Sequence, residues 1–162
     1  METERLLVRP LTVQDTDDLH AVLSDAQVMR YIETPFTRQQ TAAFIERVNT
    51  AMPPLAYAVV WKETNTVIGH LIYHPYDGES WELGWILHRE YWHRGIADEL
   101  TVAVIANAQR RKIPALVIEC DRNQLATRHI AEKHGFRYAG EETNLAVYRK
   151  NINRKGRHND GF

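Results

Sequence analysis

The chain has 162 residues, enough for one domain with a full apolar core and too few for two ordinary domains. Its 44% apolar and 25% charged residues are normal for a globular protein. With 20 Lys and Arg against 21 Asp and Glu, the chain lacks the basic surplus that general nucleic-acid binding needs. No apolar run approaches the roughly 20 residues that span a bilayer, so we expect neither a nucleic-acid nor a membrane partner.

The ends of the chain and its cysteine content bear on the compartment. The first ten residues, METERLLVRP, carry charges where a secretory signal would have its apolar centre. The single cysteine, Cys120, cannot form an internal disulfide, and its place at the end of an apolar segment favours a buried, inert thiol. We therefore expect a cytoplasmic protein.

The first half of the chain predicts a strand, two helices and a meander of three strands. Apolar and charged residues alternate before Pro10, which is typical of a half-buried strand. Thr12 is a suitable cap for the first helix, and Thr37 with Gln40 forms a capping box for the second. The predicted segments are a strand up to Pro10, helices over 11–23 and 37–52, and strands over 56–63, 67–74 and 80–87.

The second half predicts alternating helices and strands. A helix over 96–112 ends in cations, the apolar run 115–120 is typical of a buried strand, and a helix over 124–135 stops at Gly135. Strands over 136–142 and 145–150 follow, and 151–162 is a polar tail. The order β-α-α-β-β-β-α-β-α-β-β indicates a single α/β domain over 1–150 with a mixed, mostly antiparallel sheet.

A short cationic turn, HREYWHRGIADEL at 88–100, separates two apolar segments. Gly95 and Ala97 allow a ligand to approach the backbone where the helix begins, and the first helical amides have no partner within the helix. Arg94 adds a positive charge, so the turn is a candidate phosphate cradle. An ordinary tight connection would explain these residues equally well, since neither the dinucleotide fingerprint nor a Walker-type loop is present.

The residues around this turn carry a family resemblance. ELGWILHREYWHRGIADEL resembles motif A of the GNAT superfamily of N-acetyltransferases, in the branch that resembles ribosomal-protein N-terminal acetyltransferases. Gly95 and Ala97 match its small positions, whereas Trp92 replaces Gln or Arg and His93 stands where the branch usually has glycine. ERLLVRPLTVQD, VMRYIETPFTRQQTAAFI and RHIAEKHGFRYAGEE are similar to further parts of the family, so the resemblance covers roughly residues 3 to 150.

The resemblance implies a GNAT-like sheet, splayed between the fourth and fifth strands and flanked by helices, that binds acetyl-CoA as cosubstrate. It implies that an acetyl group passes to a primary amine, on a protein N-terminus or a small molecule, by direct attack. Of the two candidate carboxamides for the pantetheine arm, Asn123 is preferred to Gln124. The predicted coenzyme-binding residues are Ile86, Leu87, His93, Arg94, Gly95, Ile96, Ala97, Asp98 and Asn123.

Glu82 is the preferred general base, because a carboxylate on a central strand between apolar neighbours favours proton transfer. The alternatives are that Glu82 pairs with a cation, or that Glu33 is the base. Many family members have a tyrosine acid where this chain has Ala131, so Thr127, Tyr148 or water is left to protonate the thiolate.

The acceptor amine is not named by the sequence. Tyr31, Glu33, Phe36 and Trp81 are predicted to line its site, a mixed aromatic and acidic set that suits a cationic or peptide amine. The eight histidines show no zinc-site spacing, so we expect no metal. Two alternatives remain, namely an acyl-CoA-binding module without turnover and a phosphate-metabolite enzyme that uses the same cradle. The sequence neither requires nor excludes a homodimer.

Overall fold

The computed structural model describes residues 1–152, in which seven strands and four α-helices follow one another in the predicted order. The strands are β1 (Leu6–Pro10), β2 (Ala56–Trp61), β3 (Thr66–Pro75), β4 (Ser80–Leu87), β5 (Ala115–Asp121), β6 (Arg137–Glu142) and β7 (Leu145–Asn151). The helices are α1 (Thr16–Leu23), α2 (Arg38–Asn49), α3 (Ile96–Arg110) and α4 (Leu125–Lys133), with short 3-10 helices η1 (Val13–Asp15) and η2 (Arg89–Tyr91).

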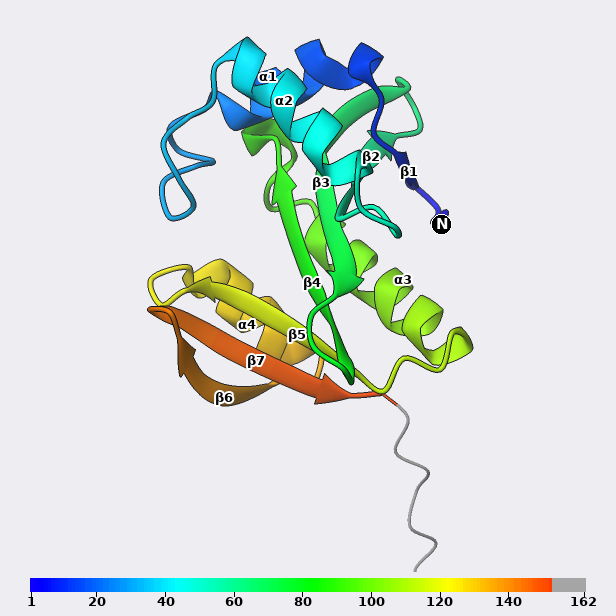
Figure 1. Cartoon of the computed structure of the whole chain (residues 1–162), viewed down its shortest axis with the longest axis vertical. Helices are drawn as coiled ribbons and strands as arrows, with labels where there is room; N and C mark the ends of the chain where they lie inside the picture. Colours follow the sequence, from blue (N-terminus) through cyan, green and yellow to red (C-terminus); the bar gives the residue numbers. More distant parts are fainter. Residues whose placement is uncertain (153–162) are drawn as a thin grey trace, which may run out of the picture.

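The sheet opens between β4 and β5, as predicted. Its strand order is β1-β2-β3-β4-β5-β7-β6, and every neighbouring pair is antiparallel except the parallel pair β4 and β5. In these two strands, only the segment Ser80–Glu82 pairs with the segment Ala115–Val117. Beyond this segment, β5 and β7 turn away from β4 (Figure 1). One edge of β4 beyond Glu82 therefore has no strand beside it.

Two apolar clusters cover the two faces of the sheet. One cluster joins α3 and α4 to the sheet through residues such as Leu100 and Ala131, and it includes Leu83 and Leu87 of β4. The other joins α1 and α2 to β2 and β3, and Ile86 packs against it. Because successive side chains of a strand alternate between faces, Glu82 and Gly84 share the face of Ile86.

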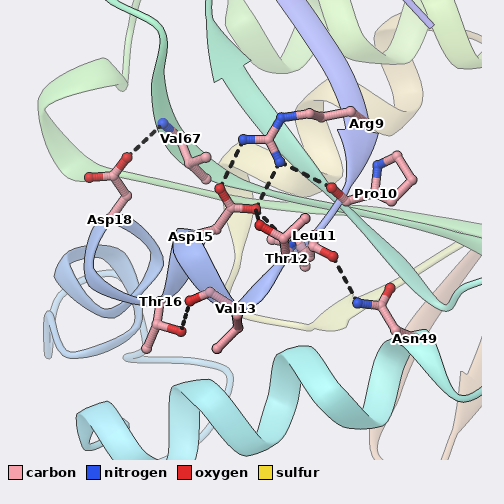
Figure 2. A network of polar contacts seen from close by, with 10 residues as sticks. All are labelled: Arg9, Pro10, Leu11, Thr12, Val13, Asp15, Thr16, Asp18, Asn49 and Val67. Atoms are coloured by element: carbon pink, nitrogen blue, oxygen red, sulfur yellow. Dashed lines mark hydrogen bonds and ion pairs between the residues drawn. The ribbon is translucent and has the colours of Figure 1, made fainter.

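Polar contacts fix α1 and α2 on the sheet (Figure 2). The Arg9 guanidinium donates to both carboxylate oxygens of Asp15, at 2.8 Å each, and the Asp15 carboxylate also accepts the Thr12 N–H. The Asn49 amide donates to the Leu11 carbonyl at 2.8 Å. These bonds join β1 to η1 and tie the end of α2 to the segment between them.

Several predicted boundaries are wrong by a few residues. The predicted first helix splits into η1 and α1, since Thr12 and Asp15 close a separate capping box. The second helix ends at Asn49 rather than 52, although its cap at Thr37 and Gln40 is confirmed, and α3 ends at Arg110. Position 151 of the predicted tail belongs to β7, and residues 153–162 lie outside the described residues. No helix within residues 1–152 is long and apolar enough to cross a membrane.

Candidate active site

A cavity of about 810 Å³ lies beside the opening between β4 and β5, and we call it the large cavity. Its walls come from the end of β4, the turn before α3, the first half of α4 and the α1–α2 loop. This volume is within the range of small-molecule and cofactor sites. The predicted site residues that line it are Tyr31, Ile86, Leu87, His93, Gly95, Ile96, Ala97, Asp98, Asn123 and Thr127.

The start of α3 forms one wall and presents backbone N–H groups. Gly95 caps the helix with φ of 74°, a left-handed conformation that favours glycine, and the first α-helical bond of α3 runs from the Glu99 N–H to the Gly95 carbonyl. The amides of 96–98 therefore have no partner within the helix, and the helix dipole adds positive potential. His93 also has positive φ, 59°, which explains why glycine suits that position.

Asp98 places a carboxylate in this otherwise anion-binding wall. Its Oδ1 accepts from His134 Nε2 at 2.7 Å and from Lys133 Nζ at 3.0 Å, both at the end of α4. Partial burial opposes its charged form, but these hydrogen bonds outweigh burial and hold the pKa of Asp98 below its ordinary value. The Lys133 ammonium thus offsets part of the negative charge that a bound phosphate would otherwise meet.

Arg94 does not line the large cavity, in contrast to the sequence prediction that it supplies charge to the phosphates. Its guanidinium carbon lies 4.9 Å from the ring centroids of both Trp61 and Tyr91. Cation–π contact with these two rings engages the guanidinium, and Arg94 is not among the residues that line the large cavity. Only the backbone of Arg94 remains available to the cradle.

The exposed edge of β4 belongs to Trp85 and Leu87 rather than to Ile86. His88 donates its N–H to the Ile68 carbonyl of β3, and the Ile86 carbonyl lies beside Gly69. Backbone groups of alternate residues point to opposite edges of a strand, so those of Ile86 face β3 and those of Trp85 face the opening. The prediction that the Ile86 backbone faces the opening is therefore wrong, although Ile86 lines the large cavity.

Trp92, at the first motif position, engages the same edge. Its indole Nε1 donates to the Leu87 carbonyl at 2.9 Å, and the residue lines the large cavity. Of the backbone groups that β4 turns toward the opening near its end, the Leu87 carbonyl is thus already satisfied. The Leu87 N–H and both groups of Trp85 lie beyond the paired segment of β4 and β5.

The opposite wall is the start of α4. The Gln124 side-chain oxygen accepts the Asp121 N–H at 2.9 Å, and the Asn123 N–H donates to Asp121 Oδ1 at 2.8 Å. This turn engages the Gln124 carboxamide oxygen, and both Asn123 and Gln124 line the large cavity, so the preference for Asn123 stays a prediction. Thr127 also lines the cavity.

Two side chains considered for chemistry lie beneath this wall. The Tyr148 hydroxyl is buried, accepts from Arg128 Nε at 2.9 Å and donates to Glu132 at 3.3 Å. Burial raises the pKa of the Cys120 thiol to about 11, which keeps it protonated at neutral pH. Neither residue lines the large cavity, so Thr127 is the one candidate acid of the chain that does.

Glu82 lies where β4 and β5 stop pairing, on the face opposite α3. Its register partners are Val117 of β5 and His74 of β3, and its Oε2 lies 3.0 Å from His74 Nε2. The alternative that Glu82 pairs with a cationic partner is thus present in the structure. Its side chain is 21% exposed and does not line the large cavity, whose lining residues from β4 are Trp85, Ile86 and Leu87.

The residues predicted to bind the acceptor do not gather in one place. Tyr31 lines both the large cavity and a second cavity of about 500 Å³, formed by the α1–α2 loop and Asp121, which we call the small cavity. Glu33 lines only the small cavity. Phe36 packs against Phe44 at 6.2 Å between ring centroids, and Trp81 lies beneath the Arg111 guanidinium, 4.4 Å from its ring centroid.

Of the α1–α2 loop residues that line the large cavity, the sequence analysis named only Tyr31. Arg30 and Ile32 line both cavities and separate them, and the loop is tied to η2 because Arg89 pairs with Asp25 at 3.1 Å and donates to Gln27. The loop has no periodicity from which its contacts could be predicted. Within residues 1–152, no group of three or more His, Cys, Asp or Glu could hold a metal ion.

The comparisons assign this opened mixed sheet, with free amides at the start of a helix, to a protein family. Residues 5–137 match the family model described as an acetyltransferase (GNAT) domain, so the chain belongs to the GNAT family. It is 27% identical over 141 residues to the uncharacterised N-acetyltransferase YnaD of Bacillus subtilis, which covers 85% of this chain and 82% of YnaD.

Solved structures show the same architecture. A GNAT-family acetyltransferase from Bacillus anthracis aligns with a TM-score of 0.84 and 26% identity, over 94% of this chain and 98% of that one. RimL, the ribosomal L7/L12 alpha-N-protein acetyltransferase in complex with coenzyme A, aligns with a TM-score of 0.79 and 19% identity. That alignment covers 93% of this chain and 96% of RimL, and at this identity it shows the shared fold.

Proposed function

We propose that the protein transfers an acetyl group from acetyl-CoA to a primary amine by direct attack, without a covalent enzyme intermediate. The observation that carries this proposal is the geometry of the opening between β4 and β5. The large cavity adjoins this opening, and the Glu82 carboxylate lies outside that cavity at the foot of the opening, where β4 and β5 stop pairing. A donor and an acceptor that enter from opposite faces would meet in this opening.

On the donor side, backbone groups supply most of the binding. The amides of 96–98 suit the pyrophosphate, and the Trp85 and Leu87 backbone suits the pantetheine arm as an added strand. A β4 amide that donates to the thioester oxygen would stabilise the negative charge that develops there. The Asn123 carboxamide and the Thr127 hydroxyl complete the wall.

On the acceptor side, Glu82 is the proposed base, acting directly or through a water. Gly84 follows on the same face and presents no side chain of its own, and the Ile72 side chain of β3 packs over it. An ammonium group must lose a proton before its nitrogen can attack a thioester. Glu33 is the rival base, and it lies on the α1–α2 loop in the small cavity rather than at the foot of the opening.

The departing thiolate needs little help. A coenzyme A thiol leaves readily, so Thr127 or water supplies its proton, and the buried Tyr148 is not part of the proposal. The acceptor is a primary amine on a protein N-terminus or on a small molecule. RimL, a structural neighbour named for its action on ribosomal protein L7/L12, motivates the first of these.

Thiol release from acetyl-CoA in the presence of a panel of amines and N-terminal peptides tests the proposal. We expect turnover with at least one amine, and Glu82→Gln should lower kcat about 100-fold, because general-base catalysis contributes about that much. The affinity for acetyl-CoA should stay within about twofold of wild type, since Glu82 lies outside the large cavity. Glu63→Gln, an exposed acid in the β2–β3 turn, is the matched control.

Two results would contradict the proposal. Stabilisation of the protein by ATP or NAD but not by acetyl-CoA would remove the donor assignment. A Glu82→Gln variant with wild-type kcat at every pH would remove Glu82 from the mechanism and favour Glu33.

A further inference from the structure

His74 on β3 and Glu82 on β4 form a cross-strand pair at the foot of the opening. They are direct register partners, and His74 Nε2 lies 3.0 Å from Glu82 Oε2. The two side chains are 20% and 21% exposed, so the pair is partly shielded and still reaches solvent. The contact with His74 uses Glu82 Oε2, so the second carboxylate oxygen is available to an incoming amine or to a water.

The protonation of His74 is constrained by its other ring nitrogen. His74 Nδ1 lies 2.7 Å from the Pro75 carbonyl oxygen. A carbonyl can only accept, so Nδ1 must carry a proton. The nitrogen that gains and loses a proton is therefore Nε2, and that nitrogen faces Glu82. One proton position consequently lies between the imidazole and the carboxylate.

The other charged groups on this side of the sheet are engaged with one another. Arg149 of β7, which is opposite Val117, lies 3.8 Å from Asp77 and 3.9 Å from Glu79. The Tyr76 hydroxyl contacts Glu119 and also Glu142, the latter at 3.0 Å. No further titratable group within residues 1–152 forms an ion pair with His74 or Glu82.

The energetics of His74 agree with a shared proton. Its hydrogen bond to Glu82 raises the pKa of His74 above the ordinary value, and the contact with the Pro75 carbonyl acts in the same direction. Partial burial opposes the shift without reversing it. The pair therefore retains a proton at a higher pH than an isolated imidazole would.

We propose that His74 is a positioning residue that joins Glu82 in one proton-accepting unit, with the tautomer of His74 fixed by the Pro75 carbonyl. The inference rests on the proposed function and names the unit that deprotonates the acceptor. An N–H bond of the acceptor ammonium breaks, an O–H bond forms on Glu82, and the amine nitrogen keeps the electron pair. The pair then holds the added proton between Oε2 and Nε2 until water removes it.

Steady-state rates over pH 5.5 to 9 with acetyl-CoA and an accepted amine test the inference, using His74→Gln, Glu82→Gln, the double variant and His74→Asn. In wild type, kcat should rise with pH as the pair loses its proton. His74→Gln should lower the plateau kcat about tenfold and move the rise to lower pH, because carboxylates alone titrate lower than imidazoles. His20→Gln, on α1 away from the opening, should match wild type at every pH.

The double variant and an NMR titration separate a shared unit from a structural role. Substitutions of residues that act together lower activity non-additively. The double variant should therefore have a kcat only slightly below that of Glu82→Gln alone. The imidazole nitrogens of His74 should titrate at lower pH in Glu82→Gln than in wild type, because the hydrogen bond that raises the pKa of His74 is weakened, and this result is independent of turnover. If His74→Gln lowers the melting temperature by more than a few degrees, His74→Asn replaces it in these experiments.

Several outcomes would overturn the inference. Wild-type turnover with a pH profile that His74→Gln does not move, or fully additive losses in the double variant, would make His74 a structural residue only. An unchanged His74 titration in Glu82→Gln would show that the two groups are uncoupled. No thiol release by wild type with any amine would instead defeat the proposed function itself, and this inference with it.

Discussion

The two faces of the opening between β4 and β5 are built from different parts of the chain. The face toward α3 and α4 presents mainly backbone groups, namely the amides of 96–98 and the β4 edge at Trp85 and Leu87. The face toward α1 and α2 presents side chains, with Glu82 and His74 at the foot of the opening and His70 beneath Phe44. Backbone groups can serve a donor that many proteins share, whereas side chains must fit one acceptor.

The largest effect is expected from a substitution on the face that presents mainly backbone groups. Gly95→Val should lower acetyl-CoA affinity about 1,000-fold, because a branched side chain at φ of 74° is strained and would crowd the phosphate site. Isothermal titration calorimetry measures the affinity. Gly78→Val is the matched control, since a Cβ at Gly78 meets nothing within 4 Å. Tight binding by a folded Gly95→Val protein would show that the phosphates lie elsewhere.

An intermediate effect is expected beneath the side-chain face, where His70 is 3% exposed and its Nδ1 has no hydrogen-bond partner. Burial lowers the pKa of His70 to about 4, so the folded protein keeps it neutral. The unfolded chain binds the proton more tightly, so this contribution to stability is present above pH 6.5 and is lost as pH falls toward 4. The loss should be on the order of 2 kcal/mol, about 30-fold in the folding equilibrium.

Urea unfolding at pH 7 and pH 4.5 measures this effect. His70→Leu should lose less stability than wild type between the two pH values, because the variant has no imidazole to protonate. His20→Leu on α1 should lose as much as wild type. Equal losses in His70→Leu and wild type would show that His70 is not the buried group that limits acid stability.

The smallest effect tests whether charge on the donor face comes from a side chain. Arg94→Gln should change acetyl-CoA affinity less than about twofold, since the guanidinium lies over Trp61 and Tyr91 outside the large cavity. Its main cost should be about 1 kcal/mol of stability from the lost cation–π contacts. A tenfold loss of affinity would mean that Arg94 turns into the cavity and that the phosphates need its charge.

The same contrast between the faces explains how much the sequence could predict. The element order and the helix start at Gly95 follow from local patterns and from motif A, and the structure has both as expected. The assignment of Ile86 to the exposed edge was wrong. Because of period-two alternation, only one of two neighbouring residues can turn its backbone groups to that edge, so Trp85 could have been predicted in place of Ile86.

The acceptor side could not be predicted in the same way. The approach of His74 to Glu82 depends on the register of β3 with β4, and a shift by one residue would move every side chain to the other face. The positions of Arg30, Tyr31 and Ile32 depend on an irregular loop held by contacts far along the chain, such as those of Arg89. Neither register nor loop contacts are encoded in local periodicity.

Amide hydrogen exchange of β4 with and without coenzyme A tests the central claim most directly. In the free protein, the N–H groups of Trp85 and Leu87 should exchange quickly and that of Ile86 slowly, because only Ile86 is bonded to β3. Coenzyme A should slow Trp85, Leu87 and the amides of 96–98 together and leave Ile86 unchanged. Protection of Trp85 and Leu87 already in the free protein, or no change there at saturating coenzyme, would contradict a donor held along an opened strand edge.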